Sequence, residues 1–182
     1  MTTVVMDASA AIGILRDEPL GPALAEVVRG VVADGGTIVV PAHFWLEVAN
    51  VLRTRHKESG HAIVEAIHKI DTFGPMTIDL DRSQLLLVID AMERHGLSGY
   101  DATYLVLART LDAMLLTQDK RLNGAAGSLA IPLPGDHRLG EDRAPYLTDR
   151  EARPTWPDYS ELSAFLSKLR ADAIRDREAV RR

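Results

Sequence analysis

The stretch VVMDASAAIGIL, from Val4 to Leu15, places a single acidic residue, Asp7, in a run that is otherwise apolar or small. The segment TVVM, which ends just before Asp7, is β-branched and apolar and predicts a buried strand. A buried carboxylate is costly unless something pairs with it. Asp7 therefore either caps a helix that begins at Ala8 or holds a cation, and the choice between these interpretations decides the function.

Short apolar runs like this one alternate with segments of helical periodicity along the chain. Besides residues 3–6, the runs that predict strands are residues 37–40, 76–80, 113–117 and 129–133. Helices are predicted within residues 19–36, 42–56, 61–70, 81–96, 98–111 and 119–127. This alternation predicts an α/β fold with a central parallel sheet flanked by helices. In such sheets, sites form beyond the carboxyl ends of the strands.

The character of the chain changes after Ile131, which suggests two parts. Five of the nine prolines lie between Pro132 and Pro157, so this stretch predicts a linker or an irregular wrap. Helical spacing then returns, with Leu162, Phe165, Leu166 and Leu169 on one stripe. We therefore expect a first domain over residues 1–133, and a Pro-rich segment with an amphipathic C-terminal helix over residues 134–182.

The composition limits the classes of function. The chain has 182 residues, 46% of them hydrophobic, a formal net charge of -5 and no cysteine. The negative charge disfavours nonspecific adhesion to nucleic acid or membranes but allows a nuclease whose acidic site is neutralised by metal. The lack of cysteine excludes disulfides and thiolate sites. With no visible signal peptide and no apolar run of the ~20 residues that span a bilayer, we expect a cytoplasmic protein without membrane contact.

Four acidic residues stand at positions where each has an ordinary structural explanation. Asp7 and Asp119 follow predicted strands and can cap the next helix. Ser98 and Asp101 have the spacing of a capping box. Glu47 lies at the edge of the apolar face of its helix, where it can reach water. Capping does not exclude metal ligation, because a carboxylate has two oxygens.

Taken together, the four acids favour a metal site. Asp7 and Asp119 should meet at one edge of a parallel sheet, with Asp101 near that edge and Glu47 facing partly inward. Clustered carboxylates repel one another unless cations compensate, and Mg²⁺ or Mn²⁺ is the natural partner of carboxylate oxygens. Zinc is disfavoured, since no paired histidine motif is present.

Four blocks in this order resemble PIN domains, in particular the toxins of VapBC toxin–antitoxin systems. The blocks are VVMDASAAIGIL, LEVANVL, LSGYDATYLVLA and LLTQDKRL. They match the family's D-x-S-A context, its E-x-x-N-V-L helix, its Y-D-A-x-Y-L helix and its T-x-D-x-x-L turn. The resemblance covers about residues 3–133, whereas residues 134–182 have no counterpart and VapBC toxins are usually shorter.

The resemblance implies a PIN-like fold and a Mg²⁺- or Mn²⁺-dependent endoribonuclease. Its acidic quartet maps to Asp7, Glu47, Asp101 and Asp119, which would be both the catalytic residues and the metal ligands. Ser9 matches the small hydroxyl residue often found near the first Asp. The resemblance further implies an RNA substrate, a homodimer and a cognate antitoxin that blocks the acidic groove.

Contacts to the substrate are predicted at four residues: Ser9, Thr117, Arg16 and Lys120. Further candidate phosphate contacts are Arg53, Arg55 and Arg121, although a solvated surface charge is the better explanation of each basic residue taken alone. No interleaving of aromatic and basic residues indicates a platform for RNA bases. Three alternatives stay open: a PIN-like domain that processes RNA without being a toxin, a non-catalytic metal-binding or interaction module, and a phosphohydrolase for small phosphates.

Overall fold

The structure is a computed structural model that describes residues 2–134 of the chain. The predicted amphipathic helix and nearly all of the Pro-rich segment lie outside these residues. Among the described helices, none combines the length and the apolar character that crossing a membrane requires.

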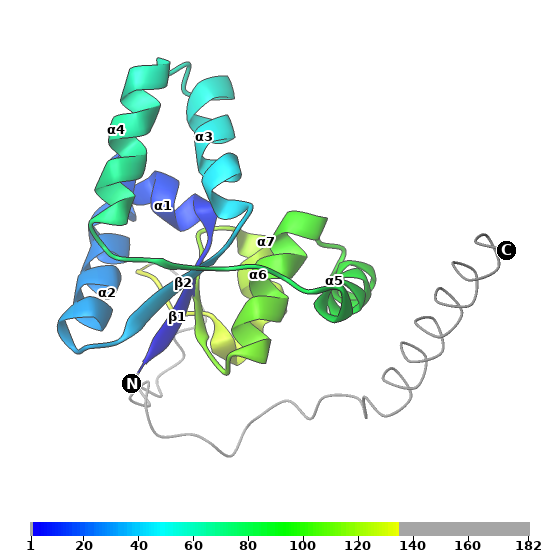
Figure 1. Ribbon diagram of the computed structural model, residues 1–182. Coiled ribbons are helices and arrows are strands. Elements are labelled where there is room, and N and C mark those ends of the chain that lie inside the picture. Colours follow the sequence, from blue (N-terminus) through cyan, green and yellow to red (C-terminus); the bar gives the residue numbers. More distant parts are fainter. Residues whose placement is uncertain (1, 135–182) are drawn as a thin grey trace, which may run out of the picture. The chain divides into compact units, whose positions relative to one another are not determined.

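A parallel sheet of four strands forms the centre of the described part (Figure 1). The strands are β1 (Thr3–Met6), β2 (Thr37–Pro41), β3 (Met76–Ile78) and β4 (Met114–Leu116), in the spatial order β3-β2-β1-β4. Val5 of β1 pairs with Val39 of β2 on one side and Leu115 of β4 on the other. The predicted α/β fold with a central parallel sheet is confirmed.

Helices connect and cover the strands, as parallel pairing requires. They are α1 (Ala8–Leu15), α2 (Gly21–Ala33), α3 (Phe44–Thr54), α4 (Gly60–Asp71), α5 (Arg82–His95), α6 (Gly99–Thr110) and α7 (Lys120–Ala126). Figure 1 shows α3 and α4 side by side as one pair and α5 beside α6, and contacts within both pairs agree with this view. Each helix predicted within residues 2–134 is present, with ends within a few residues of the sequence-based bounds.

The prediction of a fifth strand over residues 129–133 is wrong. Residues Gly127–Leu129 form a 3₁₀ turn, and only an isolated bridge joins Ala130 to Leu115. The amide of Ile131 donates to the carbonyl oxygen of Leu115 at 2.9 Å, so pairing begins there. Within residues 131–134, no further strand pairing with β4 follows this hydrogen bond.

Helix α6 lies in the core and fixes the position of Asp101, one of the four acids. Every residue from Ala102 to Ala108 is buried, and the helix contacts β1, β2 and β4 as well as α5 and α7. A helix that is covered on all sides cannot shift without opening the core. Asp101, in the first turn of α6, is therefore held in place by packing.

The close approach of α2 to α1 gives a stability prediction. A Cβ on Gly21 would lie 2.6 Å from the backbone oxygen of Gly13, and backbone cannot swing away. We expect Gly21→Ala to lower the free energy of unfolding by about 1–3 kcal/mol, the usual cost of overpacking. Urea denaturation measures this value.

Gly30 provides the matched control on the same helix, because a Cβ there meets no atom within 4 Å. Gly30→Ala should stabilise the protein by roughly 0.5–1 kcal/mol, since alanine loses less backbone entropy than glycine in a helix. Equal stability of the Gly21→Ala variant and the parent would contradict this account of the α1–α2 contact.

Candidate metal and nuclease site

The carboxyl ends of β1 and β4 meet at one point of the sheet edge. Met6 pairs with Leu116, and the next amide along, that of Asp7, donates to the carbonyl oxygen of Leu116 at 3.0 Å. Thr117 and Asp119 follow β4 at the same edge. The prediction that Asp7 and Asp119 lie at the same edge of a parallel sheet is confirmed, and the two strands they follow are neighbours.

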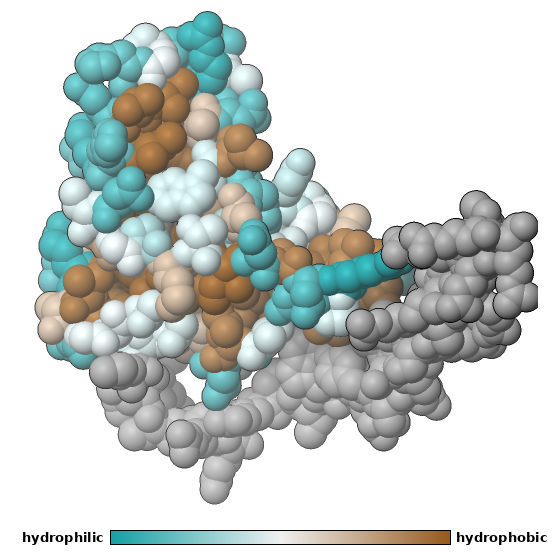
Figure 2. Space-filling model, in the orientation of Figure 1, coloured by the Kyte–Doolittle hydropathy of each residue, from teal (hydrophilic) through white to brown (hydrophobic). Residues whose placement is uncertain are grey.

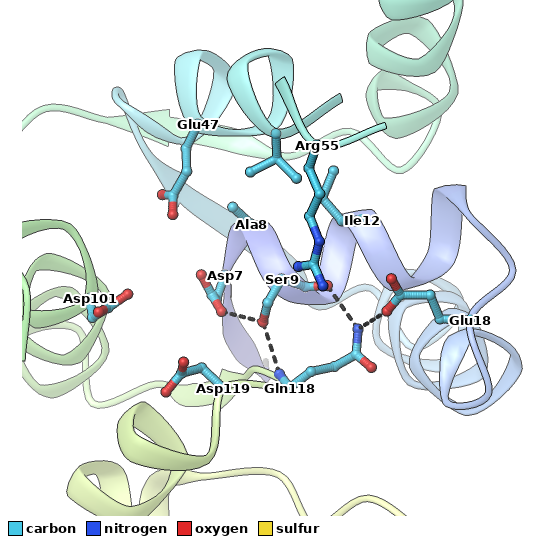
Figure 3. A pocket seen from close by; sticks show the side chains of 11 residues that line it. Asp7, Ala8, Ser9, Ile12, Glu18, Glu47, Arg55, Asp101, Gln118 and Asp119 are labelled. Atoms are coloured by element: carbon cyan, nitrogen blue, oxygen red, sulfur yellow. Dashed lines mark hydrogen bonds between the residues drawn. The ribbon is translucent and has the colours of Figure 1, made fainter. Parts of the chain in front are cut away.

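A pocket of about 340 Å³ opens at this edge, and the four acids of the sequence motifs line it. Asp7, Glu47, Asp101 and Asp119 come from four different elements, and Figure 3 shows their carboxylates around one space. Ser9 also lines the pocket, whereas Thr117, Arg16 and Lys120 do not. The structure therefore brings five of the eight predicted site residues to the pocket wall.

Asp7 is buried and bound by two hydroxyls. Only 3% of it is exposed, and its Oδ2 accepts hydrogen bonds from Ser9 Oγ at 2.5 Å and Thr117 Oγ1 at 2.7 Å. Its side chain makes no capping hydrogen bond to α1, so the interpretation of Asp7 as a side-chain cap is wrong. Burial raises the pKa of Asp7 above its usual value, and the two hydroxyls only partly offset this.

Glu47 points from α3 toward Asp7 and is only partly exposed (Figure 3). Its side chain is 28% exposed, and its Oε2 accepts a hydrogen bond from the hydroxyl of Tyr104 at 2.9 Å. Burial raises the pKa of Glu47 to about 7, with a further contribution from the charges of Asp7 and Asp101. A carboxyl group of this kind gains a proton near neutral pH unless a cation takes the proton's place.

Asp101 and Asp119 do act in helix caps, as their positions predict. Ser98 Oγ accepts from the amide of Asp101 at 3.1 Å and donates to Asp101 Oδ2 at 2.7 Å. Asp119 Oδ1 accepts from the amides of Arg121 and Leu122, both at 2.8 Å. Each cap occupies one carboxylate oxygen and leaves the second one available.

The same division holds for all four carboxylates. One oxygen accepts a hydrogen bond that fixes the group, and among residues 2–134 the other accepts none from any side chain. Hard oxygen donors of this kind suit Mg²⁺ or Mn²⁺. As placed, no three acidic or histidine side chains of the described part are close enough to hold a metal ion, in line with the mutual repulsion of like charges.

The basic candidates differ sharply in their surroundings. Arg16 forms an ion pair with Glu58 at 2.5 Å, Arg53 donates to the Glu58 carbonyl oxygen, and Arg121 donates to that of Gly96. Arg55 lines the pocket. Sequence patterns do not separate these arginines, because ion pairing depends on which residues packing brings together.

Sequence reasoning missed three residues of this region: Glu18, Gln118 and Tyr104. Glu18 and Gln118 line the pocket, and Gln118 Nε2 donates to Ser9 O at 2.9 Å and to Glu18 Oε2 at 3.2 Å (Figure 3). Tyr104 is three residues after Asp101 and thus on the same helix face, a spacing that could have identified it.

Removing the hydroxyl of Tyr104 should lower activity while sparing the fold. Tyr104→Phe keeps the buried ring but deletes the donor to Glu47 Oε2, so the charged form of Glu47 loses stabilisation. We expect a fall in the cleavage rate of about tenfold, corresponding to ~1.4 kcal/mol for a hydrogen bond to a charged group. The cleavage rate of Tyr104→Phe should also rise with pH at a higher pH than that of the parent, because Glu47 then loses its proton less readily. A pH–rate profile identical to the parent's would contradict this role of Tyr104.

Comparisons with known proteins concern the family and the fold. The PIN domain family matches residues 4–128. The fold is similar to that of VapBC2 from Rickettsia felis bound to a promoter DNA fragment, at a TM-score of 0.57 and 12% identity over 72% of this chain and 99% of that one. It is also similar to PAE2754 from Pyrobaculum aerophilum, at a TM-score of 0.53 and 20% identity over 71% of this chain and 83% of that one.

A third similar structure is VapC20 from Mycobacterium tuberculosis, described as a toxin that cleaves the sarcin-ricin loop. Its TM-score is 0.52 and its identity 18%, over 67% of this chain and 94% of that one. At these identities the similarity concerns the fold. Among curated protein sequences, none matches this chain significantly.

Proposed function

Because this chain belongs to the PIN domain family, we propose that it is a metal-dependent endoribonuclease. The reaction is hydrolysis of an RNA phosphodiester. The oxygen of a water molecule forms a bond to phosphorus, the bond to a ribose oxygen breaks, and that oxygen leaves as a hydroxyl after taking up a proton. Bound Mg²⁺ or Mn²⁺ would supply an activated water and neutralise charge on the phosphoryl oxygens.

One observation carries this proposal: four carboxylates from separate elements line one pocket, and each keeps an oxygen that accepts no hydrogen bond from a side chain of the described residues. Burying a carboxylate such as Asp7 is costly, and the hydrogen bonds from Ser9 and Thr117 offset that cost only in part. A divalent cation compensates several carboxylates at once.

The residues have distinct roles in this proposal. Asp7 and Asp101 bind the metal directly, while Glu47 and Asp119 are ligands or orient its waters. Ser9 and Thr117, predicted as substrate contacts, are better suited to orienting Asp7, because both hydroxyls donate to its Oδ2. Substrate contacts by Arg16 and Lys120 stay predictions. The ion pair of Arg16 with Glu58 disfavours a substrate contact by Arg16.

The test is cleavage of end-labelled RNA by the purified full chain with Mn²⁺ or Mg²⁺ and with EDTA. We expect cleavage only with metal, and products with a phosphate on one new end and a hydroxyl on the other. A 2′-deoxy substitution at the scissile nucleotide should preserve cleavage, since water is the nucleophile. Cyclic phosphate ends, or equal cleavage in EDTA, would rule out this mechanism.

We further propose that the chain is the toxin of a toxin–antitoxin pair, acts in the cytoplasm and forms a homodimer. The similarity to a toxin–antitoxin complex from Klebsiella pneumoniae supports a protein partner (TM-score 0.52, 12% identity, 71% of this chain and 96% of that one). Exposed apolar side chains lie on α3 and α4, at Leu46 and Val64, and Figure 2 shows apolar surface over this pair. A second apolar stripe on α5, of Leu85, Ile89 and Met92, would suit a second copy.

Growth of cells that express the chain tests the toxin role. Expression of the parent should arrest growth, and expression of an Asp7→Asn variant should not. RNA cleavage in vitro without growth arrest would instead favour a PIN domain that processes RNA. Metal uptake without any cleavage would favour the interaction module.

A further inference from the structure

Helix α3 presents one row of residues to the acidic pocket. Residues four apart share a helix face, and Glu47, Val51 and Arg55 all line the pocket. His43 continues this row one turn earlier, with its Nε2 3.9 Å from Glu47 Oε2. The row from His43 to Arg55 spans ~18 Å at 1.5 Å per residue, which is longer than one nucleotide.

One end of this row is Arg55, whose positive charge forms no ion pair with the described residues. Arg55 is exposed, and it is the only basic residue among those lining the pocket in the described part. Its guanidinium has no hydrogen bond or ion pair within residues 2–134, in contrast to Arg16 and Arg53, which bind the side chain and the carbonyl of Glu58. In Figure 3, Arg55 and Asp101 lie on opposite sides of Asp7.

The other end carries an open aromatic surface. Tyr100 is 62% exposed and directly precedes Asp101. Its ring lies 5.2 Å from the ring of His43, which lies 5.2 Å from that of buried Tyr104 at an angle of 68°. The Nε2 atom of His43 is buried and has no hydrogen-bond partner in the described residues. Tyr100 thus presents an exposed ring that packs against His43, which in turn packs against buried Tyr104.

We propose that an unpaired RNA segment lies along α3, with a base stacked on Tyr100 and His43, a phosphate on Arg55, and the scissile linkage between them at the four acids. This inference rests on the proposed ribonuclease function and adds the residues that bind the substrate on either side of the cleaved linkage. A base can stack on an exposed ring only when it is free of its duplex partners. The guanidinium supplies the phosphate contact that the acidic wall lacks.

We call this binding surface, from Tyr100 and His43 to Arg55, the track along α3. Steady-state cleavage by the full chain tests both of its ends. Tyr100→Ala should raise KM for a single-stranded oligoribonucleotide by roughly five- to a hundredfold, the range found for loss of one stacked base. Tyr100→Phe should restore the parental KM. Arg55→Gln should raise KM and lower the slope of log KM against log salt concentration by about 0.7, the value for one phosphate contact on a single strand. The kcat of these variants should stay close to the parental value, because the lost contacts bind ground state and transition state alike.

Two matched controls lie on α3 itself. Arg53 does not line the pocket and donates to the Glu58 carbonyl oxygen, which disfavours the phosphate contact predicted from the sequence. Arg53→Gln removes the same charge two residues away, and Leu46→Ala removes an exposed apolar side chain, so both should keep the parental KM. A substrate with the scissile site inside a stable duplex should be cut much more slowly than the same sequence unpaired.

The outcomes separate this inference from the function it rests on. If the parent does not cleave RNA with metal, the ribonuclease proposal fails. If the parent cleaves but Tyr100→Ala and Arg55→Gln keep its KM, or Arg53→Gln raises KM equally, only the track along α3 is wrong. A Tyr100→Ala variant that loses dimers in sedimentation while keeping the parental KM assigns Tyr100 to a protein interface and also overturns the track.

Discussion

Asp7→Asn is expected to reduce RNA cleavage by on the order of a thousandfold or more, because the amide removes the negative charge that a divalent cation requires. The substitution is isosteric, so the hydrogen bonds from Ser9 and Thr117 can be kept by the amide oxygen. Single-turnover cleavage of labelled RNA measures the loss.

The same variant should be more stable than the parent when metal is chelated. Burial raises the pKa of Asp7, which means that the folded protein stabilises the charged carboxylate less well than water does. The melting temperature of Asp7→Asn in EDTA at pH 8 should therefore exceed that of the parent. Loss of function with a gain of stability is typical of a binding site whose charged side chains destabilise the fold when the ligand is absent.

Asp81→Ala is a control for which we expect the reverse result, a loss of stability without a loss of cleavage. Asp81 caps α5 through hydrogen bonds from the amides of Ser83 and Gln84 and does not line the pocket. Its replacement should cost about 1 kcal/mol of stability, as loss of a cap does, and leave cleavage unchanged. Parental cleavage by Asp7→Asn would remove Asp7 from the mechanism.

Binding of Mn²⁺ or Mg²⁺ is expected to raise the melting temperature by about 5–10 °C at pH 8 and by much less at pH 5. A ligand at a hundred times its Kd contributes ~2.7 kcal/mol, and 1 kcal/mol is worth roughly 2–4 °C for a chain of this size. The dependence on pH arises because metal and protons compete for the same carboxylates. Thermal melts with EDTA and with metal, from pH 5 to 8.5, measure both effects.

In the metal-free protein, Asp7 and Glu47 should each contribute a loss of stability as pH rises from about 4 to above 7. Both carboxyl groups have raised pKa values in the folded state, that of Glu47 about 7, so in this range each binds more protons in the folded state than in the unfolded state. Stability then falls with rising pH. Glu47→Gln should flatten the upper part of this fall, and a metal-induced shift that is independent of pH would contradict competition at these carboxylates.

The sequence by itself determined the features that depend on neighbours along the chain. The alternation of apolar runs and helical periods predicts all four strands and all helices of the described residues. The caps formed by Ser98 and Asp119 follow from residue type and position. The acids at strand ends could be placed together because parallel strands of one sheet end at one edge. Such patterns are local, and local hydrogen bonding or periodicity is enough to decide them.

Only the tertiary structure decided what each of these groups contacts. Asp7 is bound by Thr117, 110 residues away, and Glu47 by Tyr104, 57 residues away. Packing also paired Arg16 with Glu58, left Arg55 at the pocket, set Tyr100 against His43, and stopped the fifth strand after a single bridge. The physical reason is that hydrogen bonds, ion pairs and burial depend on which distant segments the core brings into contact, and residue type and spacing alone do not contain that information.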